Sequence, residues 1–280
     1  SIPPEKVSII KNSGELDTII QNHYERGSNE EFLPPLRFGE NAIADGESIL
    51  FFNYREDSIR QISEAFVLKD IDKFPLRRLN NMHIVTMTHY EDRFSVPVAY
   101  PAETVEQPLG KLISESGRTQ LRVAETYKYA HVTYFFNGYL EPPYKDEYRV
   151  LIPSENVLNI DEHPEMMAGA VTDRIVQAVE NQSFDFILAN YANPDTVAHT
   201  GNYHAAIEAV KTIDHEIGRL VKAVLPTPVT LLITADHGNI EEVINPMTGH
   251  PETQHDPKPV PFYLIGTDYK GRRFTNYKNI

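Results

Sequence analysis

The stretch VTLLITADHGN, from Val229 to Asn239, determines how this chain can fold. Its first five residues are apolar or β-branched, and the polar residues Asp236 and His237 follow shortly after them, ahead of Gly238. A run of this length and apolarity predicts a buried strand that delivers polar side chains to the edge of a sheet. A carboxylate beside an imidazole can supply one oxygen and one nitrogen to a divalent cation, and Gly238 relaxes the backbone that follows. The stretch therefore predicts a rigidly held candidate metal site.

Two further strand-like runs flank this stretch. They are FDFILAN, from Phe184 to Asn190, and VPFYLIG, from Val260 to Gly266. Apolar residues at helical spacing predict amphipathic helices from Glu165 to Glu180 and from about Tyr203 to Val224. Strands that alternate with helices in this way favour right-handed crossovers in a largely parallel sheet, whose ligands bind beyond the carboxyl ends of the strands. The sequence therefore predicts an α/β fold.

The earlier part of the chain also alternates between strand-like and helix-like patterns of apolar residues. Its predicted elements are a helix at Glu15 to Arg26 and strands at Gly46 to Tyr54, His83 to His89, Gln120 to Ala124 and His131 to Phe136. An irregular segment with several prolines, VPVAYPAETVEQP, runs from Val96 to Pro108. We place a domain boundary in this segment, which divides the chain into residues 1–102 and 103–280.

Composition limits the classes of partner. The 280 residues are 41% hydrophobic, and 26 basic against 40 acidic residues give a formal charge of −14. Such a charge repels nucleic acid and anionic membrane surfaces, so an anionic substrate has to meet a local basic pocket. The sequence holds no cysteine, which removes disulfides and thiolate ligands. It shows neither an apolar span of eighteen residues nor a secretion leader, so we expect a cytoplasmic protein.

Five residues are candidate metal ligands. Asp195 and His199 are four positions apart, so a helical turn would place both on one face. Asp236 and His237 form a second pair, and His255 lies just before the last strand. Imidazole and carboxylate ligands without thiolates favour manganese, zinc, cobalt or iron over calcium, and this number of ligands favours two ions. Two adjacent cations suit phosphoryl chemistry, because they can hold both the attacking and the leaving oxygen.

Each candidate also has an ordinary structural interpretation. Histidine is common in this chain, and a single one is more often a core or surface residue; the others include His89, His163, His204, His215 and His250. Arg55, at a strand-to-helix junction, is placed to bind an anion, although an arginine there is more often an ordinary surface residue. Lys128 lies directly after a strand, where a lysine is more often solvated than catalytic. Asp and His residues that recur after three successive strands favour a functional site.

Several motifs resemble those of one family. Three stretches resemble the metal-binding motifs of cofactor-independent (2,3-bisphosphoglycerate-independent) phosphoglycerate mutase, a member of the alkaline phosphatase superfamily. They are ANPDTVAHTG (Ala192 to Gly201), TADHGN (Thr234 to Asn239) and the stretch around His255. FFNYRED (Phe51 to Asp57) and AETYKYAHVTYFFNG (Ala124 to Gly138) resemble its substrate-domain and hinge-side motifs. The resemblance implies an alkaline-phosphatase-like, mainly parallel sheet with helices on both faces in 103–280. It also implies part of a second α/β substrate domain in 1–102.

The resemblance further implies a role for each candidate residue. Asp195, His199 and His255 would bind one metal, normally manganese; Asp236 and His237 would bind the other; Lys128 would assist at the phosphoryl group; and Arg55 would hold the substrate phosphate or carboxylate. The family interconverts 3-phosphoglycerate and 2-phosphoglycerate in glycolysis through a phosphoserine intermediate, without 2,3-bisphosphoglycerate. It also leads us to expect a monomer when the protein is complete.

The chain departs from the family pattern in two respects. The nucleophilic serine and one aspartate ligand of the second metal come from an upstream segment in the family, so we expect them before Ser1 and the chain to match the C-terminal part of the enzyme. Ser58 stands where the family usually has an arginine, and a hydroxyl cannot replace the charge and fork of a guanidinium. Two alternatives therefore stay open: a metal-dependent phosphohydrolase of the same superfamily, and a non-catalytic metal-binding fragment that needs a partner segment.

Overall fold

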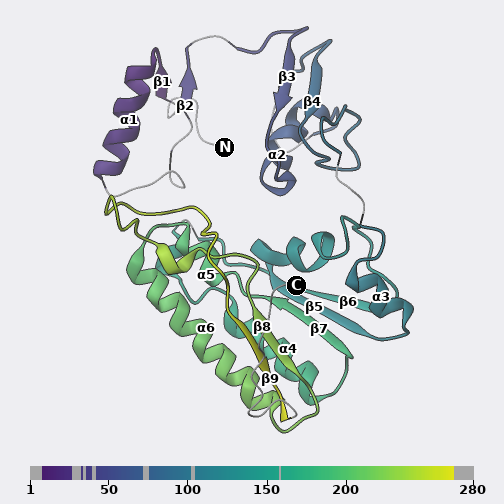
Figure 1. The fold of residues 1–280 in the computed structure, drawn as a ribbon. Helices are drawn as coiled ribbons and strands as arrows, with labels where there is room; N and C mark the ends of the chain where they lie inside the picture. The colour runs from purple at the N-terminus through teal and green to yellow at the C-terminus, as the bar shows by residue number, and fades with distance from the viewer. Residues whose placement is uncertain are drawn as a thin grey trace. The chain divides into compact units, whose positions relative to one another are not determined.

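A computed structural model describes residues 8–26, 33, 36–39, 42–71, 76–101, 105–157 and 159–267. The chain divides into two compact units (Figure 1). Unit 1 comprises Ser1–Asn22 and Pro34–Thr104, and unit 2 comprises His23–Leu33 and Val105–Ile280. Each unit is α/β, with parallel strand pairs and helices, so the fold class predicted from the sequence is confirmed.

Unit 1 contains two short parallel strand pairs. Its elements are β1 (Ser8–Ile10), α1 (Ser13–Glu25), β2 (Leu36–Phe38), β3 (Ser48–Phe51), α2 (Glu56–Val67) and β4 (His83–Thr86). β1 pairs with β2 and β3 pairs with β4, both in parallel. The predicted helix at Glu15 to Arg26 and the predicted strands at Gly46 to Tyr54 and His83 to His89 are confirmed, with strand ends a few residues shorter than expected.

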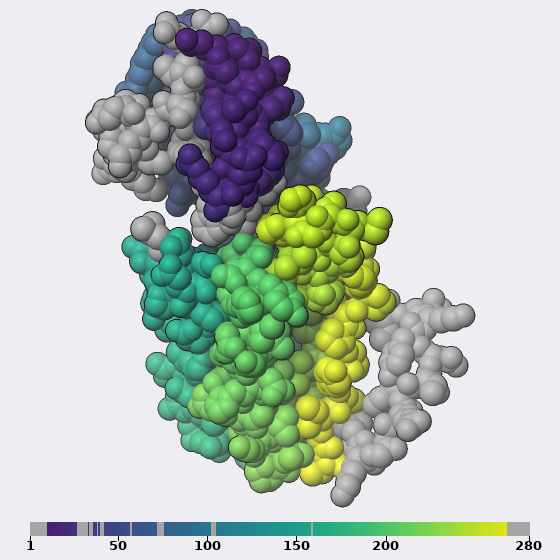
Figure 2. All heavy atoms as spheres, turned by 90° about the vertical axis from the view of Figure 1, so that its left-hand side faces the viewer, coloured from purple at the N-terminus to yellow at the C-terminus, as the bar shows by residue number. Residues whose placement is uncertain are grey.

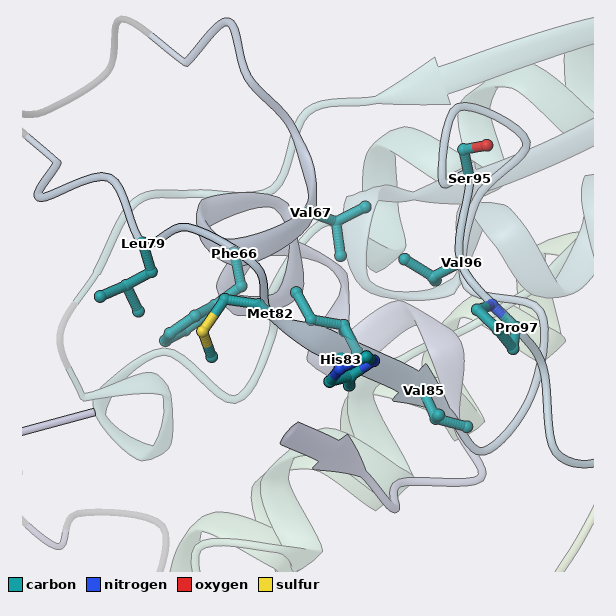
Figure 3. A pocket seen from close by; sticks show the side chains of 10 residues that line it. Phe66, Val67, Leu79, Met82, His83, Val85, Ser95, Val96 and Pro97 are labelled. Atoms are coloured by element: carbon teal, nitrogen blue, oxygen red, sulfur yellow. The ribbon is translucent and has the colours of Figure 1, made fainter. Parts of the chain in front are cut away.

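A pocket of about 410 Å³ lies within unit 1 (Figure 3). It is formed by the end of α2, the segment leading into β4, β4 itself and residues 95–97. Its lining is mostly apolar, with His83 and Ser95 as its polar side chains. A pocket with so few polar groups and no lysine or arginine in its lining is unsuited to holding a phosphate.

Unit 2 is built around a three-stranded parallel sheet. β5 (Gln120–Glu125) lies in the middle, with β6 (Glu147–Ile152) on one side and β7 (Phe186–Asn190) on the other. The sequence analysis predicted β5 and β7 but missed β6. Every residue of β5 is buried, so both faces of this central strand are covered.

Alternate residues of β5 identify the two faces. Leu121 and Val123 pack into the main apolar core with α4 (Ala168–Glu180) and α6 (Tyr203–Val224). On the opposite face the guanidinium of Arg122 lies 4.3 Å from the ring centroid of Phe136, and Gln120 bonds to the backbone of α3 (Leu109–Glu115). Helical segments therefore lie on both faces, as predicted.

The helix α6 follows the predicted bounds, Tyr203 to Val224. It begins at Asn202, whose side-chain oxygen accepts a hydrogen bond from the Ala205 amide, and one apolar face packs into the core. Figure 2 shows it as a green column along one side of unit 2. Among the described residues, no helix combines the length and the apolarity needed to cross a membrane.

The last two strands form a separate antiparallel pair. β8 (Leu231–Thr234) pairs with β9 (Phe262–Ile265), from Leu231 opposite Ile265 to Thr234 opposite Phe262. Both predicted strands exist, but β9 runs antiparallel within a fold that is otherwise parallel in its described strand pairs. Val229 and Leu231, before and at the beginning of β8, pack against the same apolar core as α4 and α6.

The structure corrects one predicted strand. HVTYFF, from His131 to Phe136, is not a strand: residues His131–Phe135 form the π-helical segment η4, which follows a 3-10 turn, η3 (Thr126–Lys128). The hydroxyl of Thr133 donates to the Tyr129 carbonyl within this turn at 2.8 Å. Aromatic and β-branched residues favour strands only where a sheet offers them a partner, and here they pack as a helical turn against β5 and β7. Single π-helical turns occur frequently at functional sites.

Candidate metal centre

Asp195 lies in the short helix α5 (Asn193–Ala198), which follows β7, and His199 is the C-cap residue of this helix. Pro194 lies in the first turn of this helix, where its missing N–H costs no hydrogen bond. The buried side chain of Asn193 donates to the carbonyl oxygens of Pro164 and Glu165 at 2.8 and 2.7 Å and fixes the beginning of α5. His199 Nε2 lies 3.1 Å from Asp195 Oδ1, so the predicted helical pairing of these two residues is found.

His255 joins this pair from a segment far along the chain. Its Nε2 atom lies 3.3 Å from Asp195 Oδ1 and 3.3 Å from His199 Nε2. An antiparallel bridge between Gly238 and Asp256 holds the segment in place, with the Asp256 amide donating to the Gly238 carbonyl at 2.8 Å. Among the described residues, Asp195, His199 and His255 form the group of three that could hold a metal ion.

The hydrogen bonds of His199 show that this group fits a divalent cation. Its Nδ1 lies 2.7 Å from the carbonyl oxygen of Thr253. Because a carbonyl only accepts, Nδ1 carries a proton, which leaves Nε2, the atom that faces Asp195 Oδ1 and His255 Nε2, as the metal-ligating atom of the ring. Electron-rich atoms this close together need a proton or a cation among them. Two nitrogens and one carboxylate oxygen, without sulfur, suit zinc, manganese or cobalt.

Asp195 is held at both of its carboxylate oxygens. The ammonium group of Lys128 donates to Oδ2, and the side-chain amide of Asn239 donates to Oδ1 at 2.8 Å. Burial alone would raise the pKa of Asp195, but hydrogen bonds from His199, Lys128 and Asn239 outweigh it and hold the pKa well below its usual range. The carboxylate is therefore ionised, as a metal ligand must be.

Asp236 and His237 follow β8 and lie next to this group. The His237 ring stacks on the His255 ring, with 3.6 Å between centroids and 16° between planes. His237 Nδ1 lies 3.2 Å from the Gly238 carbonyl, and its Nε2 lies 3.5 Å from Asp236 Oδ2. Within the described part of the chain, this pair has no third acidic or histidine ligand that would complete a second group of three.

Lys128 and Arg55 occupy different units. Lys128 ends the 3-10 turn η3 after β5 and is 5% exposed, so the alternative of a solvated lysine does not apply. Arg55 is the N-cap residue of α2 in unit 1, and its side chain is exposed. The substrate-binding role of Arg55 stays a prediction.

Two residues at the centre had no role in the sequence analysis. Asn239 is the last residue of the stretch from Val229 to Asn239, and Thr253 precedes His255 by two positions. Both act through hydrogen bonds to residues more than forty positions away, so no local pattern identifies them. Their polar character next to candidate ligands was the available signal.

Comparison with known proteins places the chain in a class. A family model for the Metalloenzyme superfamily matches residues 10–279, and the chain belongs to this superfamily. It is also similar to 2,3-bisphosphoglycerate-independent phosphoglycerate mutases, which confirms the resemblance found in its motifs. The mutase of Pseudomonas entomophila (strain L48) is 44% identical over 249 residues, which are 88% of this chain and 49% of the relative. The mutase of Idiomarina loihiensis is 43% identical over 255 residues, 90% of this chain and 50% of the relative.

A solved structure shows the same fold. The match is to a chain described as "Crystal structures of Leishmania mexicana phosphoglycerate mutase at low cobalt concentration", with a TM-score of 0.83 and 25% identity. It covers 94% of this chain and 51% of the Leishmania mexicana chain. This chain therefore spans about half the length of the relatives that it matches.

Proposed function

We propose that this chain supplies the metal-binding part of a phosphoglycerate mutase that interconverts 3-phosphoglycerate and 2-phosphoglycerate in glycolysis. The observation that carries the proposal is the convergence of Asp195, His199 and His255. It occurs in a chain more than 40% identical to mutases along nearly 90% of its length. Because the chain spans half of those relatives, the proposed reaction belongs to the complete protein, whose nucleophilic serine would come from outside this chain.

The residues of the centre would hold two divalent ions. Asp195, His199 and His255 would bind one, and Asp236 and His237 would contribute to the other. We propose manganese, with zinc, cobalt or iron as alternatives, and no 2,3-bisphosphoglycerate; the name of the relatives and the cobalt of the Leishmania structure support this proposal. Bound metal would supply positive charge that activates a hydroxyl nucleophile and neutralises a phosphoryl group.

The protein's own groups prepare that chemistry. The Thr253 carbonyl selects the His199 tautomer that presents Nε2, and the Lys128 ammonium and the Asn239 amide orient the Asp195 carboxylate. The Lys128 ammonium contacts the predicted ligand Asp195, so we propose that it also faces the phosphoryl group. Its burial strengthens that interaction, because a charge inside the protein is screened less than one at the surface.

Residues 1–102 would form part of the substrate-binding domain, and residues 103–280 most of the metal-binding domain. Arg55, at the beginning of α2, would bind the phosphate or carboxylate of the substrate. The Ser58 hydroxyl donates to the Arg55 carbonyl at 3.3 Å and brings no second positive charge. We therefore expect weaker substrate binding through α2 than two arginines would give. We further propose a cytoplasmic monomer that binds no nucleic acid or membrane.

An enolase-coupled assay tests the proposed function. The chain is completed with the part of the Pseudomonas entomophila mutase outside the match, and 3-phosphoglycerate is supplied with manganese or with a chelator. We expect isomerisation with manganese only, and its loss in Asp195→Ala. Asp214→Ala, at an exposed position of α6, is the control and should stay active. Undiminished turnover in Asp195→Ala would overturn the assignment, and phosphate release without isomerisation would favour a phosphohydrolase.

A further inference from the structure

We infer that Asn239 is a positioning residue of the metal centre: its side-chain amide fixes the orientation of the Asp195 carboxylate and links α5 to the segment after β8. Asn239 is 4% exposed and lies two positions after His237. It contacts the ligands of the first group although it belongs to the segment of the second pair. The inference rests on the proposed metal centre.

The chemistry of its neighbours determines which end of the amide faces the ligands. Nδ2 lies 2.8 Å from Asp195 Oδ1 and 3.4 Å from both the Asp195 carbonyl oxygen and His199 Nε2. The two oxygens can only accept hydrogen bonds, because one belongs to the ionised carboxylate and the other to a backbone carbonyl. A flipped amide would direct its own oxygen at these two acceptor oxygens. The N–H donors of Asn239 must therefore point toward Asp195.

The Asn239 amide donates to the Asp195 oxygen that faces the two histidine ligands. Asp195 Oδ1 is the atom that faces His199 Nε2 at 3.1 Å and His255 Nε2 at 3.3 Å. Lys128 holds the other oxygen, so the carboxylate cannot rotate without breaking a contact at one end. Asn239 thereby orients the lone pairs of Asp195 Oδ1. Partners of this kind typically change metal affinity by about 10- to 100-fold when they are removed.

Asn239 also joins two parts of the centre. Its backbone amide donates to Glu241 Oε2 at 2.8 Å, which ties it to the turn η6 (Ile240–Glu242). Ile240 in that turn packs against the apolar cluster of Ala192 and Val197 around α5. A shift of the segment after β8 would therefore be transmitted to Asp195 through this side chain.

A second buried asparagine provides a matched control. Asn137 is 1% exposed, and its Nδ2 donates to Glu147 Oε2 at 2.7 Å. The Oδ1 atoms of Asn137 and Asn239 both lack a hydrogen-bond partner among the described residues. The two side chains thus share burial, donor and carboxylate acceptor, but Asn137 contacts none of the predicted metal ligands in the hydrogen bonds described.

The test measures manganese binding to the 280-residue chain by titration calorimetry, for the unmodified protein, Asn239→Leu and Asn137→Leu. Leucine keeps the approximate shape of asparagine and removes its donor. Thermal unfolding without metal reports stability separately. We expect Asn239→Leu to weaken manganese binding by about 10- to 100-fold and Asn137→Leu to leave it unchanged. If a leucine variant does not fold, Asn239→Ala and Asn137→Ala replace the pair, and affinity is taken from the rise in unfolding temperature with manganese.

The possible outcomes distinguish failure of the positioning role of Asn239 from failure of the proposed metal centre. Unchanged binding in Asn239→Leu would show that the donor has no positioning role. An equal loss in both variants would show a general effect of burial and would also overturn the inference. Absence of binding by the unmodified chain would remove the proposed metal centre and the role of Asn239 with it.

Discussion

The ammonium group of Lys128 donates a hydrogen bond to Asp195, and only 6% and 18% of the two side chains are exposed. A buried ion pair contributes little by its presence, but removal of one partner leaves the other charge uncompensated. We expect Lys128→Met to lower the free energy of unfolding by about 3–5 kcal/mol without metal. Urea denaturation measures this loss, and manganese should reduce it by replacing the missing positive charge near Asp195.

The surface pair of Lys211 and Glu208 on α6 is the control for this prediction, with 65% and 57% of its side chains exposed. Solvent screens such a pair, so Lys211→Met should cost no more than about 1 kcal/mol. A similar cost for both lysine variants, or a cost in Lys128→Met that manganese does not change, would contradict the role given to Lys128.

Gly238 is required by close packing at the centre. A Cβ atom there would lie 2.0 Å from Glu241 Oε1 and 2.8 Å from the Asp256 carbonyl oxygen. Glu241 can turn away, but the Asp256 backbone belongs to the bridge that positions His255. We therefore expect Gly238→Ala to destabilise the protein by about 1–3 kcal/mol and to weaken manganese binding.

Gly218→Ala in α6 is the matched comparison, because a Cβ atom there would meet nothing within 4 Å. It should stabilise the protein by roughly 0.5–1 kcal/mol through helix propensity. Thermal unfolding and manganese titration of both variants check the pair. Equal behaviour of the two variants would show that the close approach at Gly238 does not matter.

Glu125 ends β5, is 1% exposed and accepts a hydrogen bond from Ser154 at 2.9 Å. Burial raises the pKa of its carboxyl, although the Ser154 hydroxyl and the Met167 backbone amide oppose the shift. A raised pKa means that the folded protein holds this proton more tightly than the unfolded chain. This contribution to stability is therefore complete at low pH and is lost as pH rises through the folded pKa.

Glu125→Gln removes the charge that the folded protein must bury at high pH. We expect its advantage in free energy of unfolding over the parent to be larger at about pH 8 than at about pH 5. Urea denaturation of both proteins in metal-free buffer measures the difference. A difference that does not change with pH would show that Glu125 does not titrate as its burial implies.

Much of the fold follows from the sequence because its apolar residues recur at the regular spacings of helices and strands. α6 matches its predicted range, since apolar residues recur at helical spacing and prolines follow its end. η4 was wrongly predicted because strand propensity at His131 to Phe136 is overridden by packing against β5 and β7. β6 was missed, although it lies beside β5 throughout its length.

The candidate metal centre, like the fold, was predicted only in part from the sequence. Asp195, His199 and His255 were identified from their positions near predicted strands, and the structure brings them together. Asn239 and Thr253 could not be identified, because their hydrogen bonds depend on which loops meet in three dimensions. Residue type and spacing indicate ligands, whereas the residues that orient ligands become visible only in the folded chain.

The most direct test of the proposed centre is a crystal structure of the chain grown with manganese, with anomalous diffraction at the manganese edge. We expect an anomalous peak within coordination distance of Asp195 Oδ1, His199 Nε2 and His255 Nε2. Lys128 should remain on Asp195 Oδ2 and Asn239 on Oδ1. No peak among these three atoms in manganese-containing crystals, or a peak that these residues do not coordinate, would contradict the account.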